Sequence, residues 1–248
     1  MPKHTYSYTV PFKVRSYEVD HHQEANISSI CNYFQEAAGL HARELKFDIS
    51  DLQKKGLTWI LYKLQVKVYT FPKRWESLRV TTWPSTGDGL RAYRDYELYN
   101  EEDKVLAVGL SQWMVVDIHK KRPVKMPDEL MSSRFKTDNH VLELNKNNLM
   151  SVTDKDAEFI STAGLNDLDM NKHVNNVRYI DWMTGYNFTE CKSKKCNEII
   201  IQYSAETKVG DKIYLARNFN PDSKDEIDYT LFKNTEKRII ANAKTFWS

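Results

Sequence analysis

The chain has 248 residues, of which 41% are hydrophobic and 12% aromatic, enough for one large domain or two small ones with packed cores. Eight Gly and seven Pro are too few for a disordered chain, and a formal net charge of +2 gives no support for nucleic-acid binding. The N-terminal sequence MPKHTYSYTV lacks an apolar signal core, and no run approaches ~18 apolar residues, so we expect neither secretion nor membrane spanning.

The first predicted helix follows a short extended segment. Asn26 is a suitable N-cap, because its side chain can accept a hydrogen bond from the first helical turn. Apolar residues then recur at helical spacing, and Gly39 offers a C-terminal stop. The apolar set is Ile27, Ile30, Cys31, Phe34, Ala37 and Ala38. Four segments rich in β-branched and aromatic residues follow without an intervening helix, which indicates an antiparallel sheet. They span residues 58–71, 78–83, 92–99 and 105–117.

The second half repeats this order after a connection. Residues 119–156 break the strand pattern with prolines and scattered charges. Asn175 or Asn176 is then expected to cap a helix that continues through Met183. The predicted strands of this half span 198–207, 212–219, 227–232 and 238–247. We therefore predict an α+β fold with an N-terminal unit at 1–125, a linker at 126–156 and a C-terminal unit at 157–248.

Short matches in the same order indicate that the second half is a copy of the first. The matching pairs are Asp20 with Asp169, Asn26 with Asn175, Gln65 with Gln202, and Asp95 with Asp228. The separation shrinks along the chain, as expected when the second copy has shorter loops.

Four stretches of sequence form one recognisable set. The most specific is Asp-x-Asn-x-His-Val-Asn-Asn, which begins at Asp169. The others are VRSYEVDHHQEANISSICNYFQEAAGLHA, LQVKVYTFP and RPVKMPDEL. Together they resemble the acyl-acyl carrier protein thioesterases of plant plastids and bacteria, over nearly the whole chain. The resemblance implies a tandem hotdog fold, in which an antiparallel sheet wraps around a central helix twice per chain. It also implies hydrolysis of fatty acyl-acyl carrier protein, which releases a free fatty acid and ends chain elongation.

The same resemblance implies a set of catalytic residues by position in its motifs. They are Asp169, Asn171, His173 and, from the strand IIIQYSAET, Glu206. Plant members carry a cysteine directly after that glutamate, whereas Thr207 stands here. This departure argues against a thiol nucleophile at that position, so the chemistry must use another group, most simply water.

The spacing of the motif residues is compatible with thioester hydrolysis in either of two conformations of the segment 169–173. In an extended segment, Asp169, Asn171 and His173 would point to one side. In an irregular loop they would lie just before a helix N-terminus, whose unpaired N–H groups could stabilise a thioester oxyanion. We hypothesise that Glu206 is the base for water and that Asn171 helps to hold that water. Asp169 would orient His173, which polarises the substrate or shares the proton transfer. Direct attack by Glu206, giving an anhydride, stays open.

The first copy has lost this set, so we expect one active site per chain. Its residues matching Asn171, His173 and Glu206 are His22, Glu24 and Tyr69. Its helix face, with Cys31 and Phe34, could instead line a slot for the acyl chain. Substitutions along Leu57–Tyr62 would then shift the preferred chain length.

The cysteines and the basic clusters bear on compartment and partners. The cysteines, Cys31, Cys191 and Cys196, form neither a disulfide framework nor a metal-ligand pattern, so we expect no metal, no cofactor and a cytoplasmic protein. The basic clusters are mainly solvated surface, but one of their uses could be docking of an acidic carrier protein. They consist of Lys73, Arg74, Lys120, Lys121, Arg122, Lys125, Lys192, Lys194 and Lys195.

Several alternatives stay open at this point. The carrier could be coenzyme A, the protein could be a hotdog dehydratase or hydratase acting on the acyl chain, or it could bind acyl groups without catalysis. The sequence does not decide the oligomeric state, and a homodimer is one of the options. We predict no nucleic-acid and no membrane partner.

Overall fold

The computed structural model describes residues 6–85, 87–127, 139–186 and 194–248. The chain divides into two compact units, the N-terminal unit Met1–Asn145 and the C-terminal unit Lys146–Ser248. This division falls within the predicted linker at 126–156. Within the described ranges, none of the helices combines the length and the apolar character that a membrane span requires.

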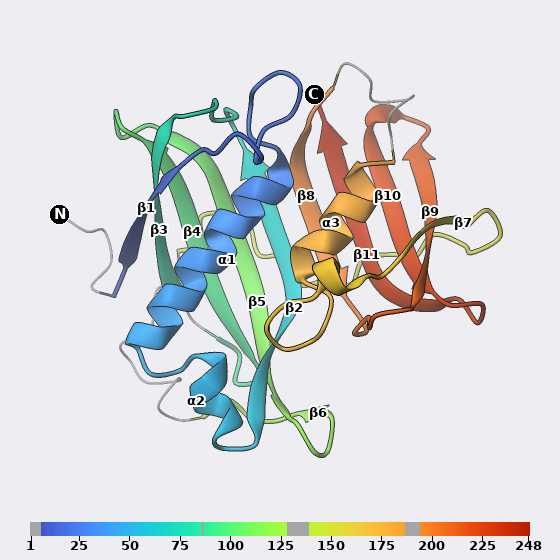
Figure 1. The fold of residues 1–248 in the computed structure, drawn as a ribbon, viewed down its shortest axis with the longest axis horizontal. Coiled ribbons are helices and arrows are strands. Elements are labelled where there is room, and N and C mark those ends of the chain that lie inside the picture. The colour runs from blue at the N-terminus through green and yellow to red at the C-terminus, as the bar shows by residue number, and fades with distance from the viewer. Residues whose placement is uncertain (1–5, 86, 128–138, 187–193) are drawn as a thin grey trace. The chain divides into compact units, whose positions relative to one another are not determined.

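The N-terminal unit is an antiparallel sheet with one long helix against it (Figure 1). The strands run in the order β1-β3-β4-β5-β2, with the short β6 paired to β5. Their bounds are β1 (Tyr8–Lys13), β2 (Leu57–Val68), β3 (Ser77–Ser85), β4 (Arg91–Asn100), β5 (Val105–Asp117) and β6 (Arg122–Pro123). The helices are α1 (Ile27–Glu44) and the short α2 (Ile49–Gln53).

The start of α1 agrees with the prediction, and its end does not. The side chain of Asn26 caps the helix by accepting a hydrogen bond from Ser29 N. The predicted stop at Gly39 is wrong, because α1 continues through it to Glu44. Gly39 has no positive φ, and the helix beyond it still buries His41, whose Nδ1 lies 3.0 Å from Arg94 Nη1 of β4. Burial of this face outweighs the weak helix preference of one glycine.

The core of the N-terminal unit lies between α1 and the sheet. The ring of Phe34 on α1 stacks on Tyr96 of β4 with 4.9 Å between centroids. A Cβ atom at Gly109 of β5 would come within 2.8 Å of Phe34, so only glycine leaves room for the ring. Phe34 and Tyr96 are 1% and 2% exposed, which makes this contact the centre of the helix–sheet packing.

The C-terminal unit has the same architecture with a shorter helix. Its strands run in the order β8-β11-β10-β9-β7, and all of its strand pairs are antiparallel. The elements are β7 (Glu158–Thr162), the 3-10 helix η2 (Leu165–Asp167), α3 (Asn176–Thr184), β8 (Cys196–Tyr203), β9 (Lys212–Asn220), β10 (Ser223–Lys233) and β11 (Arg238–Trp247). Asn175 caps α3, and its side chain accepts a hydrogen bond from Val177 N. The α+β prediction is therefore confirmed in both halves.

The internal repeat appears in the strand order and in the register. Read from the first strand of each unit, β1-β3-β4-β5-β2 and β7-β9-β10-β11-β8 are the same order. Tyr96 of β4 faces Gly109 of β5, and Tyr229 of β10 faces Ala243 of β11, so Asp95 and Asp228 are equivalent.

One predicted match of the repeat is two residues out of register. Val68 faces Ala107, and Tyr203 faces Ala241, so Gln202 corresponds to Lys67 and not to Gln65. The short match of Leu-Gln with Ile-Gln arose by chance, because alternating strand sequences look alike when shifted by two residues.

The described parts of the predicted linker are held on the sheets by polar contacts. In the N-terminal unit, Val141 N donates to Asp95 Oδ1 at 2.9 Å, and His140 Nδ1 lies 3.0 Å from Asp95 Oδ2. In the C-terminal unit, Val152 N donates to Thr230 Oγ1 at 2.7 Å. Asp95 adjoins Tyr96, which faces α1, so this contact lies on the opposite face of the sheet.

Candidate active site

The motif Asp169–His173 forms a tight loop immediately before α3. Asp169 N donates to His173 O at 2.8 Å, and Leu168 and Val174 form an isolated bridge on either side. Lys172 closes the loop in the left-handed region, with φ of 63°. Of the two conformations considered from sequence, the loop before a helix N-terminus is therefore the one adopted, and the extended segment is not.

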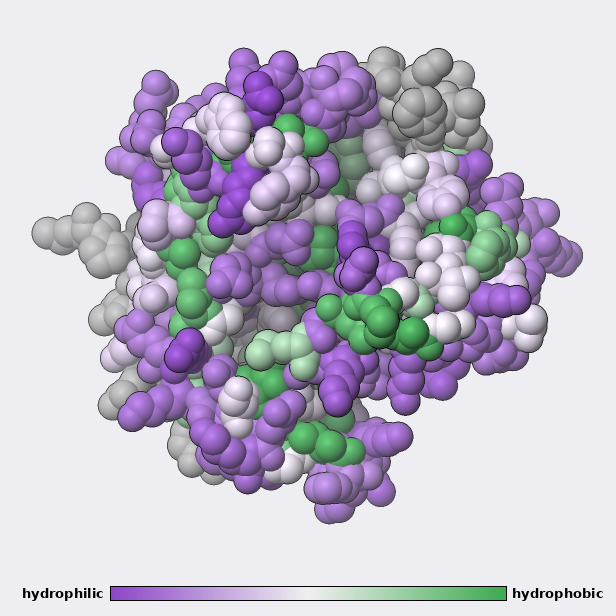
Figure 2. Space-filling model, in the orientation of Figure 1, coloured by the Kyte–Doolittle hydropathy of each residue, from purple (hydrophilic) through white to green (hydrophobic). Residues whose placement is uncertain are grey.

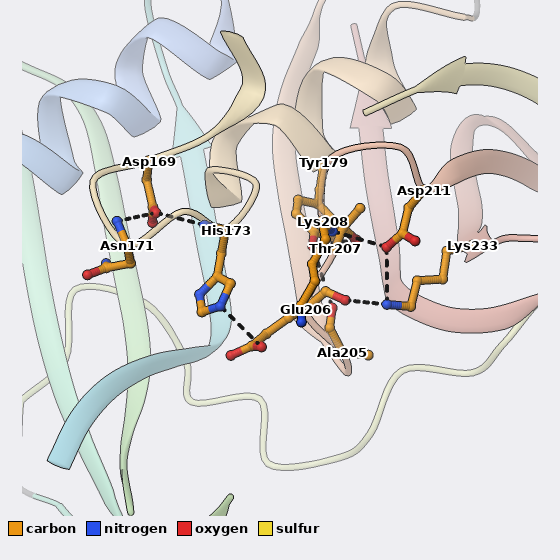
Figure 3. Close-up of polar contacts among 10 residues, drawn as sticks. All are labelled: Asp169, Asn171, His173, Tyr179, Ala205, Glu206, Thr207, Lys208, Asp211 and Lys233. Atoms are coloured by element: carbon orange, nitrogen blue, oxygen red, sulfur yellow. Dashed lines mark hydrogen bonds and ion pairs between the residues drawn. The ribbon is translucent and has the colours of Figure 1, made fainter. Parts of the chain in front are cut away.

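Asp169 organises the backbone of this loop. Its Oδ1 accepts hydrogen bonds from Asn171 N at 2.8 Å and from His173 N at 3.3 Å (Figure 3). The hypothesis that Asp169 orients the imidazole of His173 needs correction, because the contacts of its Oδ1 are to backbone N–H groups. It fixes where His173 lies along the loop, and another carboxylate faces the imidazole.

That carboxylate belongs to Glu206. The distance between His173 Nε2 and Glu206 Oε2 is 3.4 Å, and the two side chains are 40% and 51% exposed. Glu206 follows the end of β8, where Ser204 N and Ala205 N both donate to Ile240 O of β11. The structure thus brings together two of the four predicted catalytic side chains at a solvent-accessible place (Figure 3).

The predicted role of Asn171 is not evident from its position. Figure 3 shows its side chain pointing away from the pair of His173 and Glu206. Its backbone N–H is the group that takes part in the loop, through Asp169. Holding water beside the carboxylate would require another orientation of this side chain.

A backbone hydrogen bond joins the two segments that carry His173 and Glu206. Val174 N, directly after the histidine, donates to the carbonyl of Thr207, directly after the glutamate, at 3.1 Å. The separation of the His173 and Glu206 side chains is therefore restrained by a hydrogen bond between their chain neighbours.

Two further side chains hold the Glu206 segment. Tyr179 OH of α3 donates to Thr207 Oγ1 at 2.8 Å, and Thr207 is fully buried. Lys233 Nζ of β10 donates to the carbonyl of Glu206 at 2.7 Å and lies 3.3 Å from Asp211 Oδ2 (Figure 3). Sequence reasoning missed Tyr179 and Lys233, because a tyrosine on a buried helix face and a lysine at a strand end carry no motif.

The N-terminal unit repeats the loop without the reacting groups. Asp20 Oδ1 accepts hydrogen bonds from His22 N and Glu24 N, and Gln23 has φ of 63°, as in the motif loop. Ala25 N donates to Pro72 O, the counterpart of the bond between Val174 and Thr207. Phe71 therefore corresponds to Glu206, and the earlier match with Tyr69 is wrong by two residues for the same register reason. Glu24 and Phe71 stand where His173 and Glu206 stand in the second copy.

The surroundings of the site include exposed apolar side chains. Leu165 of η2 and Met170 of the motif loop are 78% and 83% exposed. Figure 2 shows apolar surface over the segment that leads into α3. In the part of the chain that the structure describes, no group of three or more His, Cys, Asp or Glu residues could hold a metal ion.

Comparison with known proteins gives several curated relatives that cover about two thirds of this chain. Palmitoyl-acyl carrier protein thioesterase, chloroplastic, of Gossypium hirsutum is 31% identical over 185 residues, which cover 69% of this chain and 45% of that protein. The protein of the same name from Cuphea hookeriana is 32% identical over 187 residues, with the same coverage. The chain thus spans about half the length of the curated relatives it matches.

Solved structures show the same fold over the whole chain. An acyl-ACP thioesterase from Bacteroides thetaiotaomicron superimposes with a TM-score of 0.87 at 20% identity, covering 98% of each chain. The 12:0-ACP thioesterase from Umbellularia californica superimposes with a TM-score of 0.85 at 22% identity, covering 99% of this chain and 98% of that one.

Family models match both halves. The acyl-ACP thioesterase N-terminal domain matches residues 5–133, and the acyl-ACP thioesterase C-terminal domain matches residues 153–248. The two matches cover most of the 248 residues, in the order that the family prescribes. The chain belongs to the acyl-ACP thioesterase family.

Proposed function

We propose that the protein hydrolyses the thioester of fatty acyl-acyl carrier protein and releases a free fatty acid. Membership of the family supports the substrate class, and the pair of His173 and Glu206 supports the reaction. The observation that carries the proposal is the 3.4 Å approach of imidazole and carboxylate in one copy of a repeated loop whose other copy lacks both groups.

In the proposed reaction, the Glu206 carboxylate removes a proton from water as the water oxygen attacks the thioester carbon. The tetrahedral intermediate collapses, the C–S bond breaks, and the sulfur leaves with the electron pair. The proton passes from Glu206, directly or through His173, to the sulfur. A thiolate leaves readily because thiol pKa values lie near ~8.5, so one acid–base pair is enough.

The start of α3 supplies a donor for the oxyanion. Among the described N–H groups from Asn171 to Arg178, all except that of Asn176 donate hydrogen bonds within the protein. Asn176 is the first residue of α3, so its N–H also carries the positive end of the helix dipole. A carbonyl oxygen bound there would gain stabilisation as negative charge develops.

A turnover screen tests the proposal directly. The protein is incubated with acyl groups of increasing length on carrier protein and on coenzyme A, and both free acid and free thiol are quantified. Release of both products from the carrier-bound substrate supports the proposal. Conversion of the acyl chain with the thioester intact would show a hydratase or dehydratase, and tight acyl binding without products would show a binding module.

The carrier protein is proposed to meet the basic clusters of the surface. Lys120 and Lys121 are exposed on the turn between β5 and β6, and Arg122, the first residue of β6, is also exposed. Lys192 lies outside the described residues. A cluster of positive charges attracts an acidic protein over a distance, before the two surfaces touch.

The cytoplasm is the proposed location, and the described thiols fit a reducing compartment. Cys31 and Cys196 are both buried and are not joined in disulfides, whereas Cys191 lies outside the described residues. Cell fractionation with a tagged chain checks this.

A further inference from the structure

Thr207 and Glu206 lie next to each other but face opposite environments. The Glu206 side chain is 51% exposed beside His173, whereas Thr207 is fully buried. The two residues follow the end of β8 and share one planar peptide unit, which couples the directions of their side chains. Fixing the direction of the Thr207 side chain therefore fixes the direction of Glu206.

A hydrogen bond from the helix provides this restraint. Tyr179 OH donates to Thr207 Oγ1 at 2.8 Å, from within the buried face of α3. Burial raises the pKa of Tyr179 to about 12, so the hydroxyl stays a donor over the pH range in which an enzyme of this kind works. A buried hydroxyl–hydroxyl contact of this length has a defined geometry, unlike apolar packing.

The internal repeat offers a comparison within the same chain. Both copies contain the backbone bond between the helix-entry loop and the strand end, from Ala25 to Pro72 and from Val174 to Thr207. The positions that correspond to Tyr179 and Thr207 are Ile30 and Pro72, which have no side-chain hydroxyl. The hydroxyl contact thus occurs in the copy that carries the His–Glu pair and is not needed to form the repeated fold.

We infer that Thr207 and Tyr179 form a positioning pair, which holds Glu206 at the distance from His173 that water activation requires. The pair contacts neither of these side chains and acts through the backbone between residues 206 and 207. The inference rests on the proposed hydrolysis and deepens it. It also gives a role to the hydroxyl of Thr207, the residue at which this chain departs from the plant members of the family.

The test compares Thr207→Val, which keeps the shape but lacks the hydroxyl, with Thr207→Ser, which keeps the hydroxyl. We expect Thr207→Val to lower kcat about tenfold or more with little change in KM, because a displaced catalytic group loses transition-state stabilisation. Thr207→Ser should restore most of kcat. Tyr179→Phe removes the same hydrogen bond from the other side, together with the longer 3.5 Å contact of its hydroxyl with Ala205 O. It should lower kcat at least as much as Thr207→Val, which covers the case in which one variant folds poorly.

Thr245→Val is a matched control in the same unit. Thr245 is also fully buried, and its Oγ1 accepts a hydrogen bond from Trp247 Nε1 at 2.7 Å. It faces Ile199, four residues before the end of β8 that leads to Glu206. We expect this variant to lose thermal stability comparable to Thr207→Val while keeping the kcat of the parent protein.

Two kinetic results would overturn the inference. One is that both the Thr207→Val and the Tyr179→Phe proteins keep the parental kcat. The other is a further tenfold loss when Thr207→Val is added to Glu206→Gln, because a residue acting through Glu206 has no effect once the carboxylate is gone. If the parent protein shows no hydrolysis, the proposed function fails instead. Crystal structures then decide the inference, which is overturned if Thr207→Val keeps the 3.4 Å separation of His173 Nε2 and Glu206 Oε2.

Discussion

At the residue scale, the carboxylate of Glu206 is the group on which the proposed chemistry depends most. Replacing Glu206 with Gln removes the base but keeps the shape, so we expect kcat to fall by about 10²–10⁴. The side chain is half-exposed, so stability should change little. Released thiol measured at saturating substrate gives kcat, and a thermal melt confirms the fold. A Glu206→Gln protein with near-parental turnover would remove Glu206 from the mechanism.

Asp169 allows a comparison of two loops that share the same backbone hydrogen bonds to an aspartate. Asp169→Ala and Asp20→Ala each remove an acceptor of two backbone N–H groups, at similar distances. Each change should lower the free energy of unfolding by about 1–3 kcal/mol. Only Asp169→Ala should also lower kcat, because only its loop carries His173. Denaturant unfolding and turnover of both variants provide the check, and equal losses of kcat would mean that Asp169 has a purely structural role.

At the scale of the element, the sequence was sufficient to place the beginnings of α1 and α3, and the end of α3 within one residue, but not the end of α1. Asn26 and Asn175 act locally, through their own side chains, so each cap could be recognised from a few residues. The end of α1 depends on how far the sheet offers a surface to bury, which is tertiary information. The same limit applies to Tyr179 and Thr207, because their contact joins residues of α3 and the end of β8 that only the fold brings together.

The unexpected position of Gly39 inside α1 leads to a stability prediction. A Cβ atom at this position would have no neighbour within 4 Å, so alanine fits without strain. Gly39→Ala should raise the free energy of unfolding by about 0.5–1 kcal/mol, because alanine loses less backbone entropy on forming a helix. Urea unfolding of the variant and parent measures the difference. A decrease in stability would show that this part of α1 does not form a regular helix.

The packing of α1 on β4 also predicts a pH dependence. Burial, and secondly the neighbouring guanidinium of Arg94, lower the pKa of His41 from 6.5 to about 3. The unfolded state binds the proton more readily than the folded state. The contribution of His41 to the free energy of unfolding therefore falls as the pH drops below about 6.5, and it continues to fall down to about pH 3. At pH 4.5 the loss relative to pH 7 should reach about 2–3 kcal/mol. His41→Gln should remove this part of the acid sensitivity, and an unchanged difference between the two pH values would contradict the assignment.

At the scale of the whole molecule, the internal repeat was visible in the sequence, but its register could only be settled by the strands. The Asp and Asn of the loops were matched correctly because they have fixed positions in a tight turn. The matches at Gln65 and Tyr69 failed because strand sequences alternate, and a shift of two residues preserves the pattern. Phe71 in place of Glu206 still supports one catalytic copy per chain, by a different residue than predicted.

The basic surface of the molecule gives the last prediction, which concerns the carrier. Changing Lys120, Lys121 and Arg122 together to Glu should raise the apparent KM for acyl-acyl carrier protein several-fold without changing kcat, because exposed charges act mainly on association. The KM for a small acyl thioester, which has no acidic protein surface, should stay the same. Lys104→Glu is the matched control for the single change Lys121→Glu, since both lysines are exposed but lie at opposite ends of β5. Lys121→Glu should raise the apparent KM for acyl-acyl carrier protein more than Lys104→Glu does. This difference in KM should shrink as ionic strength rises, because salt screens such interactions beyond about 10 Å at 0.1 M. Equal effects of the triple change on carrier-bound and small substrates would place the carrier on another surface.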